Sequence, residues 1–371
     1  MIFEKRDNLT SVKMAAVSAD PNYRFRRAME DTYTIIDRFG GQEGWGFFAV
    51  YDGHGGSQVA QSAQKELHKV FFKCIQNSFQ DDDDNTLLNQ VQINKEFQNE
   101  NQMNSNDNKN SVNDNKNLNE NKEIPEKKPI EKDNKKQNEA ESDIDDSDSD
   151  SGESETEVET EVETDPEIEV NSVFTESFAK TIEEIDVSTL QINRVFAKCY
   201  SEFDGLIPKN NGLNTGATAV TCFIMKHRGK RMLFTANIGD SRAILVRENK
   251  PVMLTFDHKP TVKEEEERVS KAGGFISSNR ILGLLAVSRS FGDFSMKEFV
   301  SHEPFTTEFE LTEQDKILII ACDGIWDVIT NDQAVELIKD LKDASQMSKT
   351  LLNHAIKSGS TDNITCMVVL L

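Results

Sequence analysis

The sequence predicts an α+β domain that is interrupted by one long low-complexity segment. Short apolar runs rich in aromatic and β-branched residues recur along most of the 371 residues, and such runs are typical of strands. Apolar residues at helical spacing occur in a few stretches, early and late in the chain. Many strands combined with few helices favour a layered α+β fold.

The N-terminal part is predicted to contain two strands and one helix. Residues 33–36 and 45–51 have strand character and are separated by a pair of glycines. The second run is short, aromatic and β-branched, and it ends abruptly in Asp52, with His54 following among glycines. The apolar period then changes, so 57–80 is predicted to be an amphipathic helix.

Residues 81–170 form a low-complexity segment that is Asn-rich at first and acidic later. Its composition offers too little apolar surface to offset the entropy of ordering the chain, so we expect a disordered insertion. We interpret the insertion as a solvated loop, with phosphorylation by an acid-directed kinase as the alternative. Residues 1–80 and 171–371 are then expected to form a single folded domain.

After the insertion, helical periodicity returns first and strand patterns follow. The pattern predicts one or two helices over 174–185 and 192–203, and further helices at 264–271, 333–341 and 348–356. It predicts strands at 217–225, 232–238, 243–246, 316–322 and 364–371. The strands 232–238 and 243–246 flank Gly239-Asp240-Ser241-Arg242. That tight turn predicts a β-hairpin.

The composition excludes several classes of protein. The net charge is −23 and the isoelectric point is about 4.7, which argues against a nucleic-acid-binding surface and against docking on anionic membranes. Five widely spaced cysteines without a CxxC pattern indicate buried, reduced thiols. No signal peptide or membrane-spanning run is apparent. We therefore expect a monomer without a membrane anchor inside the cell, in the cytoplasm or the nucleus.

Aspartates recur where predicted strands meet turns: Asp52, Asp240, Asp323 and Asp362. One such aspartate is ordinary turn chemistry, but four suggest a shared acidic cluster, although the sequence does not show that the strand ends meet. Carboxylates side by side need cations to remain ionised. Hard oxygen ligands without a Cys/His cluster point to Mg²⁺ or Mn²⁺.

Eight motifs outside the insertion resemble, in order, those of the type 2C (PPM) metal-dependent Ser/Thr protein phosphatases. They are Arg26–Asp31, Tyr51–Gly56, Thr215–Ala219, Asn237–Arg242, Asp257–Pro260, Leu285–Asp293, Ala321–Asp327 and Ser360–Thr365. The resemblance implies a four-layer α-β-β-α sandwich of two antiparallel sheets flanked by helices. It also implies phosphorylated proteins as substrates.

The resemblance also implies roles for individual residues. Two Mn²⁺ or Mg²⁺ ions share Asp52. The carbonyl of Gly53 completes one ion's site, and Asp323 and Asp362 complete the other's. The other residues that match the family's site are Glu30 and Asp31 (metal-bound waters or direct ligation), Asp240 and Asp327 with Asp323 (a third, weaker ion), Arg26 (the substrate phosphate) and His54 (the general acid).

The chemistry fits these residue types. Two divalent ions neutralise the phosphate dianion and generate a bridging hydroxide, which attacks in line without a phosphoenzyme. Arg26 offers a planar fork to two phosphoryl oxygens, and His54 can protonate a poor alkoxide leaving group.

For several of these residues a purely structural role remains an alternative. Asp240 could pair with Arg242, Asp327 could be partly structural, and His54 could be a hydrogen-bonded turn residue. Asp293 is interpreted as a hydrogen-bonding structural acid. For the whole chain, the alternatives are a two-metal nuclease or phosphodiesterase and a catalytically weak regulatory or binding module of phosphatase type.

Overall fold

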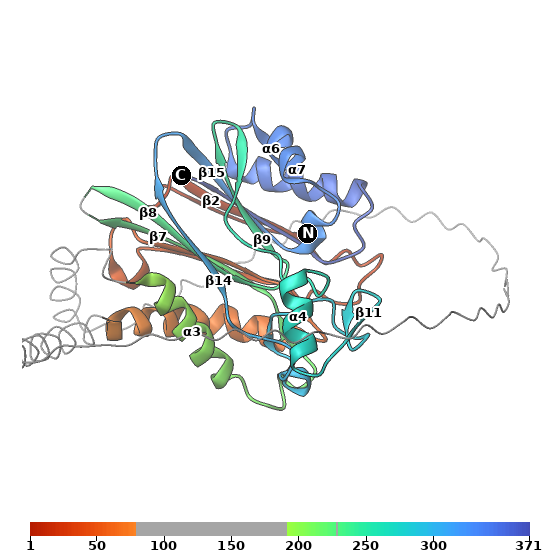
Figure 1. The fold of residues 1–371 in the computed structure, drawn as a ribbon. Coiled ribbons are helices and arrows are strands. Elements are labelled where there is room, and N and C mark those ends of the chain that lie inside the picture. The colour runs from red at the N-terminus through yellow and green to blue at the C-terminus, as the bar shows by residue number, and fades with distance from the viewer. Residues whose placement is uncertain (79–190, 228) are drawn as a thin grey trace, which may run out of the picture. The chain divides into compact units, whose positions relative to one another are not determined.

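Most strands of the described residues lie in two antiparallel sheets (Figure 1). A computed structural model describes residues 1–78, 191–227 and 229–371, with only the backbone of residue 227. The expectations placed on 81–170, on 174–185 and on the domain boundaries at the insertion lie outside these residues.

The first sheet has six strands, in the order β1-β2-β16-β15-β9-β10. Their bounds are Ile2–Asp7, Met14–Asp20, Ile364–Leu370, Asp315–Ala321, Arg242–Arg247 and Lys250–Met253. The second sheet has five strands, in the order β14-β8-β7-β4-β3. Their bounds are Phe305–Leu311, Lys230–Ile238, Ala219–His227, Gly46–Tyr51 and Thr32–Asp37.

Helices cover the outer face of each sheet (Figure 1). The helix over 58–78 and α3 (Ile192–Leu206) pack on the five-stranded sheet, whereas α6 (Asn331–Ile338) and α7 (Ala344–Lys357) pack on the six-stranded sheet. The helix α4 (Lys263–Lys271) lies over a smaller apolar cluster. This arrangement confirms the α+β class and the α-β-β-α order of layers. In this part of the chain no helix is long and apolar enough to cross a membrane.

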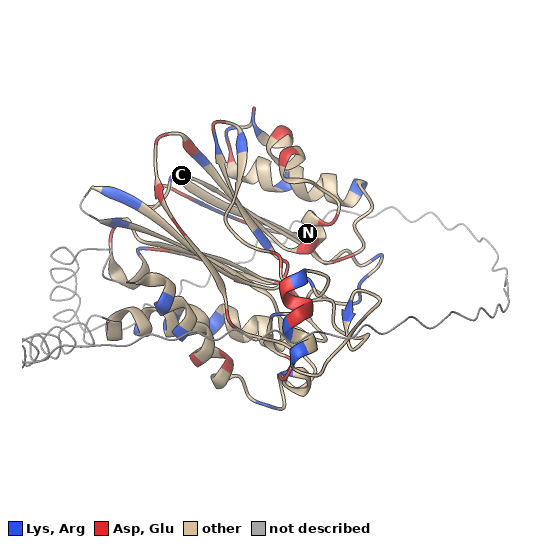
Figure 2. Cartoon of the chain, viewed as in Figure 1, with Lys and Arg blue, Asp and Glu red and all other residues tan. Residues whose placement is uncertain are grey.

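The side chains of the five-stranded sheet alternate between two apolar cores, one under the helices and one between the sheets. Along β4, Phe47, Ala49 and Tyr51 point to the helices, and Phe48 and Val50 point to the other sheet. A strand buried on both faces reads as the continuous apolar run that the sequence shows. In Figure 2 the central strands carry almost no charge.

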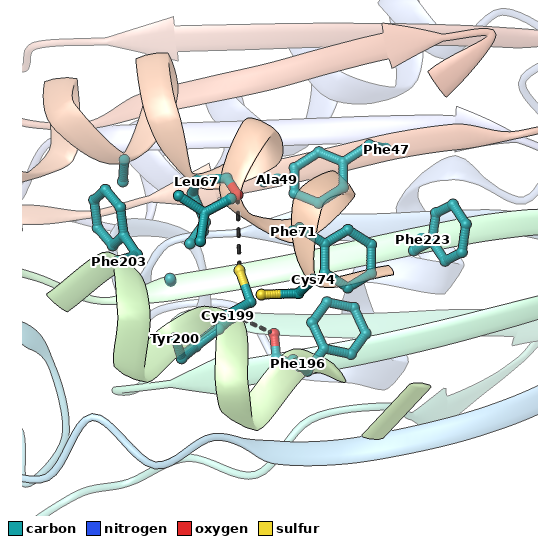
Figure 3. Packing of buried hydrophobic residues seen from close by; sticks show 14 of the residues in the cluster. Phe47, Ala49, Leu67, Phe71, Cys74, Phe196, Cys199, Tyr200, Phe203 and Phe223 are labelled. Carbon is teal, nitrogen blue, oxygen red and sulfur yellow. Dashed lines mark hydrogen bonds between the residues drawn. The ribbon is translucent and has the colours of Figure 1, made fainter. Parts of the chain in front are cut away.

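The core under the helix over 58–78 is aromatic (Figure 3). Phe71 stacks on Phe196 at a ring-centroid distance of 4.4 Å and meets Phe223 edge-on at 5.3 Å. Such offset and edge-to-face pairs add to the free energy gained by burying the rings. In the same core, the Cys199 thiol donates to the Leu67 carbonyl at 3.7 Å. All five cysteines are buried and free of disulfides, which confirms that prediction.

The predicted hairpin of 232–238 with 243–246 is wrong. β8 pairs with β7 and β14 in one sheet, and β9 pairs with β15 and β10 in the other. Both strands already have a neighbour on each side, so the turn at Gly239 carries the chain across to the second sheet. Gly239 has a φ of 85°, which glycine adopts readily.

The sequence also failed to indicate four strands of these two sheets, β1, β2, β10 and β14. β1, β10 and β14 lie at sheet edges. The last four residues of β1 are all charged, and in β14 the charged Glu308 and Glu310 alternate with apolar residues. Charges on edge strands prevent pairing with other chains, and they also weaken the apolar signal.

Candidate metal centre

The acidic residues meet where both sheets end on the same side. Asp52 directly follows β4, Asp323 begins the short helix α5 (Asp323–Trp326) after β15, and Asp240 lies at the crossing from β8 to β9. One ligand atom from each of these three side chains lies within 4.8 Å of the other two. The question that the sequence left open is thereby answered: these strand ends do converge.

The electrostatic cost of this convergence appears in the pKa values. Desolvation raises the pKa of Asp52 well above its usual value, and the charges of Asp323, Asp31 and Asp240 raise it further. The pKa of Asp323 is raised in the same way, first by burial and then by Asp240 and Asp362. Five acids that oppose one another's ionisation form a site whose charge a cation would relieve.

Asp31 lies beside this cluster, just before β3. Its carboxylate accepts a hydrogen bond from the Thr365 hydroxyl at 2.7 Å. Burial raises its pKa to about 6, and the charge of Asp362 adds to the effect. Burial also raises the pKa of Asp362, with the guanidinium of Arg26 opposing the rise.

Arg26 faces the cluster directly. Its Nη2 donates to the Asp362 carboxylate, and its Nε donates to the Thr361 carbonyl at 3.3 Å. Its neighbour Arg24 instead lies over the ring of Phe25, at 5.3 Å from the centroid. Of these two arginines, only Arg26 ion-pairs with an acid of the site.

Glu30 and Gly53 are neighbours in space. A Cβ on Gly53 would lie 2.4 Å from the Glu30 carbonyl oxygen, so only glycine fits between β4 and the loop before β3. The Glu30 amide donates to the side-chain oxygen of Asn363 at 2.8 Å. Glu30 therefore borders the site through both of its backbone groups.

Asn363 fastens the loop that carries Arg26, a role that the sequence did not reveal. Besides accepting from Glu30, its amide nitrogen donates to the carbonyls of Pro21 at 2.7 Å and Ala28 at 3.0 Å. The side-chain amide of Asn22 returns two bonds, to the carbonyls of Ser360 and Asp362. The motif position of Asn363 was visible in the sequence, but its partners lie more than 300 residues away.

Replacing Asn363 with alanine is expected to destabilise the fold by about 2–4 kcal/mol. The substitution removes three hydrogen bonds of a buried side chain and leaves their backbone partners unpaired. Urea unfolding measures the loss, and Asn353→Ala on the exposed face of α7 is the matched control. A loss of unfolding free energy below about 1 kcal/mol would show that water molecules take over the hydrogen bonds of the Asn363 side chain.

Asp240 does not pair with Arg242, the alternative that the sequence left open. Arg242 forms a bidentate pair with Asp257, at 3.1 and 2.6 Å. The Lys259 ammonium lies 3.6 Å from Asp240 and 3.0 Å from Asp327. Burial nevertheless raises the pKa of Asp240 to about 6, against the pull of this lysine. Lys259 therefore lies between two acids of the site.

His54 lies on the short strand β5 (Gly53–His54), which pairs with β6 (Gly216–Ala217). Its Nε2 is 2.7 Å from the Asp293 carboxylate, and Asp293 is 3 % exposed. This agrees with the interpretation of Asp293 as a hydrogen-bonding acid. The ring of His54 remains partly exposed.

The donor set suits a hard divalent cation. All members are carboxylates or carbonyls, and the pKa of each of Asp31, Asp52, Asp240, Asp323 and Asp362 is raised. Mg²⁺ and Mn²⁺ prefer oxygen ligands of this kind. The residues present therefore fit the metal ions that the motifs imply.

The family model and the related sequences that match this chain point to the same protein family. The family model described as protein phosphatase 2C matches residues 15–122 and 127–364. The protein phosphatase 2C homolog 1 of Saccharomyces cerevisiae is 29 % identical over 96 % of this chain and 92 % of its own length. The protein of the same description from Schizosaccharomyces pombe is 30 % identical over 98 % of this chain and 75 % of its own length.

A solved structure with a similar fold carries the same family description. The crystal structure of a serine-threonine phosphatase 2C from Toxoplasma gondii superposes with a TM-score of 0.60. The superposition covers 99 % of both chains at 17 % sequence identity.

Proposed function

This chain belongs to the protein phosphatase 2C family, and we propose that it hydrolyses phosphoserine and phosphothreonine with two Mn²⁺ or Mg²⁺ ions. The family makes it a metal-dependent phosphatase of phosphoproteins. The observation that carries the finer proposal is the convergence of Asp52, Asp240 and Asp323 beside Asp31 and Asp362. An intact acid cluster also speaks against a catalytically weak binding module.

We assign the metal ligands from the motifs. Asp52 is assigned to both ions, the Gly53 carbonyl to one of them, and Asp323 and Asp362 to the other. Glu30 and Asp31 would hold waters or ligate directly, and Asp240 and Asp327 with Asp323 would hold a third, weaker ion. When bound, the ions neutralise charge and make a water molecule more acidic.

Arg26 and His54 are assigned to the substrate. The planar guanidinium of Arg26 can donate two parallel hydrogen bonds to a phosphoryl group, which a lysine cannot reproduce. His54 donates a proton to the serine or threonine oxygen as its bond to phosphorus breaks. The electron pair of that bond stays on the leaving oxygen, and the attacking water supplies the new oxygen and replaces the proton. The products are the free alcohol and inorganic phosphate.

Hydrolysis of a phosphothreonine peptide tests this function. We expect turnover with Mn²⁺ or Mg²⁺ and none in excess chelator. A single-stranded DNA and a bis-aryl phosphodiester are the controls for a two-metal nuclease or phosphodiesterase. Turnover that persists in chelator would contradict the metal mechanism, and faster cleavage of the diester would contradict the substrate class.

Mn²⁺ is expected to raise the melting temperature of the metal-free protein, and more so at pH 7 than at pH 5. The pKa values of Asp31 and Asp240 are raised to about 6 in the folded chain. Raised carboxyl pKa values favour folding at low pH, and this contribution is lost as pH rises from about 4 through 6. Above pH 6 the carboxylates are ionised, and a bound ion compensates for their repulsion. Below pH 6 protons compete with the ion for the same carboxylates.

Thermal unfolding with and without Mn²⁺ measures this effect independently of turnover. At about 100 times the dissociation constant, the stabilisation should reach about 2.7 kcal/mol. An equal shift at pH 5 and pH 7 would place the ion elsewhere.

A further inference from the structure

Behind His54 lies a buried carboxylate that the proposed reaction does not use. Among the residues that the structure describes, the Asp293 side chain hydrogen-bonds to His54 and Ser290, and neither is assigned to a metal ion. Its Oδ2 lies 2.7 Å from His54 Nε2. The Ser290 hydroxyl donates to the same oxygen. Both Asp293 and Ser290 are almost wholly buried.

The backbone is built around this contact. β6 lies between β5 and β13 (Phe291–Gly292), with His54 opposite Gly216 and Gly216 opposite Gly292. A Cβ on Gly216 would lie 2.1 Å from Asp293 Oδ2 and 2.4 Å from His54 Nε2. The two side chains therefore meet across a strand position that only glycine can occupy.

The turn that carries Asp293 is itself held firmly. The buried Asp204 of α3 accepts from the Gly292 amide at 2.9 Å and from the Lys297 ammonium at 2.8 Å. Lys297 also donates to the carbonyls of Gly292 and Ser290. A carboxylate on such a support holds its partner ring in a fixed orientation.

We propose that Asp293 is a positioning residue that fixes the imidazole of His54, with Nε2 bound to it and Nδ1 left to protonate the leaving oxygen. The two ring nitrogens differ, and the hydrogen bond of one decides the role of the other. The ring of His54 is partly exposed and Asp293 is buried, so the exposed part of the ring lies on the side away from Asp293. The inference rests on the proton-donor role proposed for His54.

The test compares two substrates with different leaving groups. A phosphothreonine peptide releases a poor alkoxide that needs a proton, whereas p-nitrophenyl phosphate releases a stable phenolate that does not. For Asp293→Asn we expect kcat on the peptide to fall by about 10²-fold, as for loss of a general acid, and kcat on the aryl phosphate to change little. Asparagine keeps the shape of the side chain and tolerates the left-handed φ of 50° at this position.

His54→Gln should show the same selectivity, and adding Asp293→Asn to it should cause no further loss, because the two residues act as one unit. Asp315→Asn is the matched structural control. It removes the charge of another buried aspartate, which pairs with Arg247 at the start of β15, the end of the strand opposite to Asp323. It should therefore lower stability and leave the ratio of the two activities unchanged. Equal losses on both substrates for Asp293→Asn, or additive losses in the double variant, would overturn the proposal.

A second measurement needs neither metal nor turnover. Proton NMR of the metal-free protein should show a downfield, exchange-protected imidazole N–H, assigned by its loss in His54→Gln. Asp293→Asn should shift or remove this signal, and Asp315→Asn should retain it. An unchanged signal in Asp293→Asn would refute the contact. If the wild type hydrolyses no phosphopeptide, the proposed function fails; if only the substrate ratio or the signal stays unchanged, the role of Asp293 fails.

Discussion

Asp52→Asn is expected to lower phosphopeptide turnover by about 10³-fold or more and at the same time to stabilise the metal-free protein. The amide keeps the shape of the side chain but removes the negative charge assigned to both ions. Charge stabilisation by bound metal amounts to several kcal/mol in the transition state, and each ~1.4 kcal/mol corresponds to a factor of ten in rate.

The stability gain follows from the sign of the pKa shift. Burial and four neighbouring acids raise the pKa of Asp52, so its ionisation opposes folding above the usual aspartate range. A neutral amide removes that cost, and the gain should vanish below about pH 4, where the carboxyl group is protonated in both states. Thermal unfolding in chelator, over this pH range, measures the difference.

Asp340→Asn, an exposed acid at the end of α6, is the control for overall charge. It should leave turnover and the pH dependence of unfolding unchanged. Full activity of Asp52→Asn, or a lower melting temperature in chelator at pH 7, would contradict the assignment of Asp52.

Arg26→Ala is expected to lower kcat/KM for the phosphopeptide by about 100-fold, and Arg26→Lys should not restore it. Hydrogen bonds to charged groups contribute about 1.5–3 kcal/mol, and a lysine lacks the paired donors of the guanidinium. The guanidinium of Arg26 is also paired with the carboxylate of Asp362, which places it beside the acids of the site.

Arg24→Ala is the matched control, because Arg24 lies in the same loop and stacks on Phe25. It should change kcat/KM little. The Mn²⁺ affinity of Arg26→Ala, measured by calorimetry, should be equal to or higher than that of the wild type, since Asp362 loses a competing cation. A larger effect of Arg24→Ala, or recovery in Arg26→Lys, would assign the phosphate to another residue.

Local sequence patterns predicted a strand well where both of its faces are buried. β4 and β15 are sandwiched between two apolar layers, so both appear as continuous apolar runs with an aspartate at the end. Edge strands such as β1 were missed, because charges interrupt their pattern. The hairpin of β8 with β9 was predicted wrongly, because a tight turn indicates a change of direction and not which strand will be the neighbour.

The sequence by itself determined the class of fold, the family through eight motifs in order, and the acids that end the strands. Only the tertiary structure decided that Asp52, Asp240 and Asp323 converge, that Asn363 holds the arginine loop, and that Asp293 meets His54. Periodicity and turn chemistry act over a few residues, and a linear sequence displays them directly. These contacts depend on sheet pairing between segments far apart, such as Asn22 and Ser360, which are 338 residues apart in the chain.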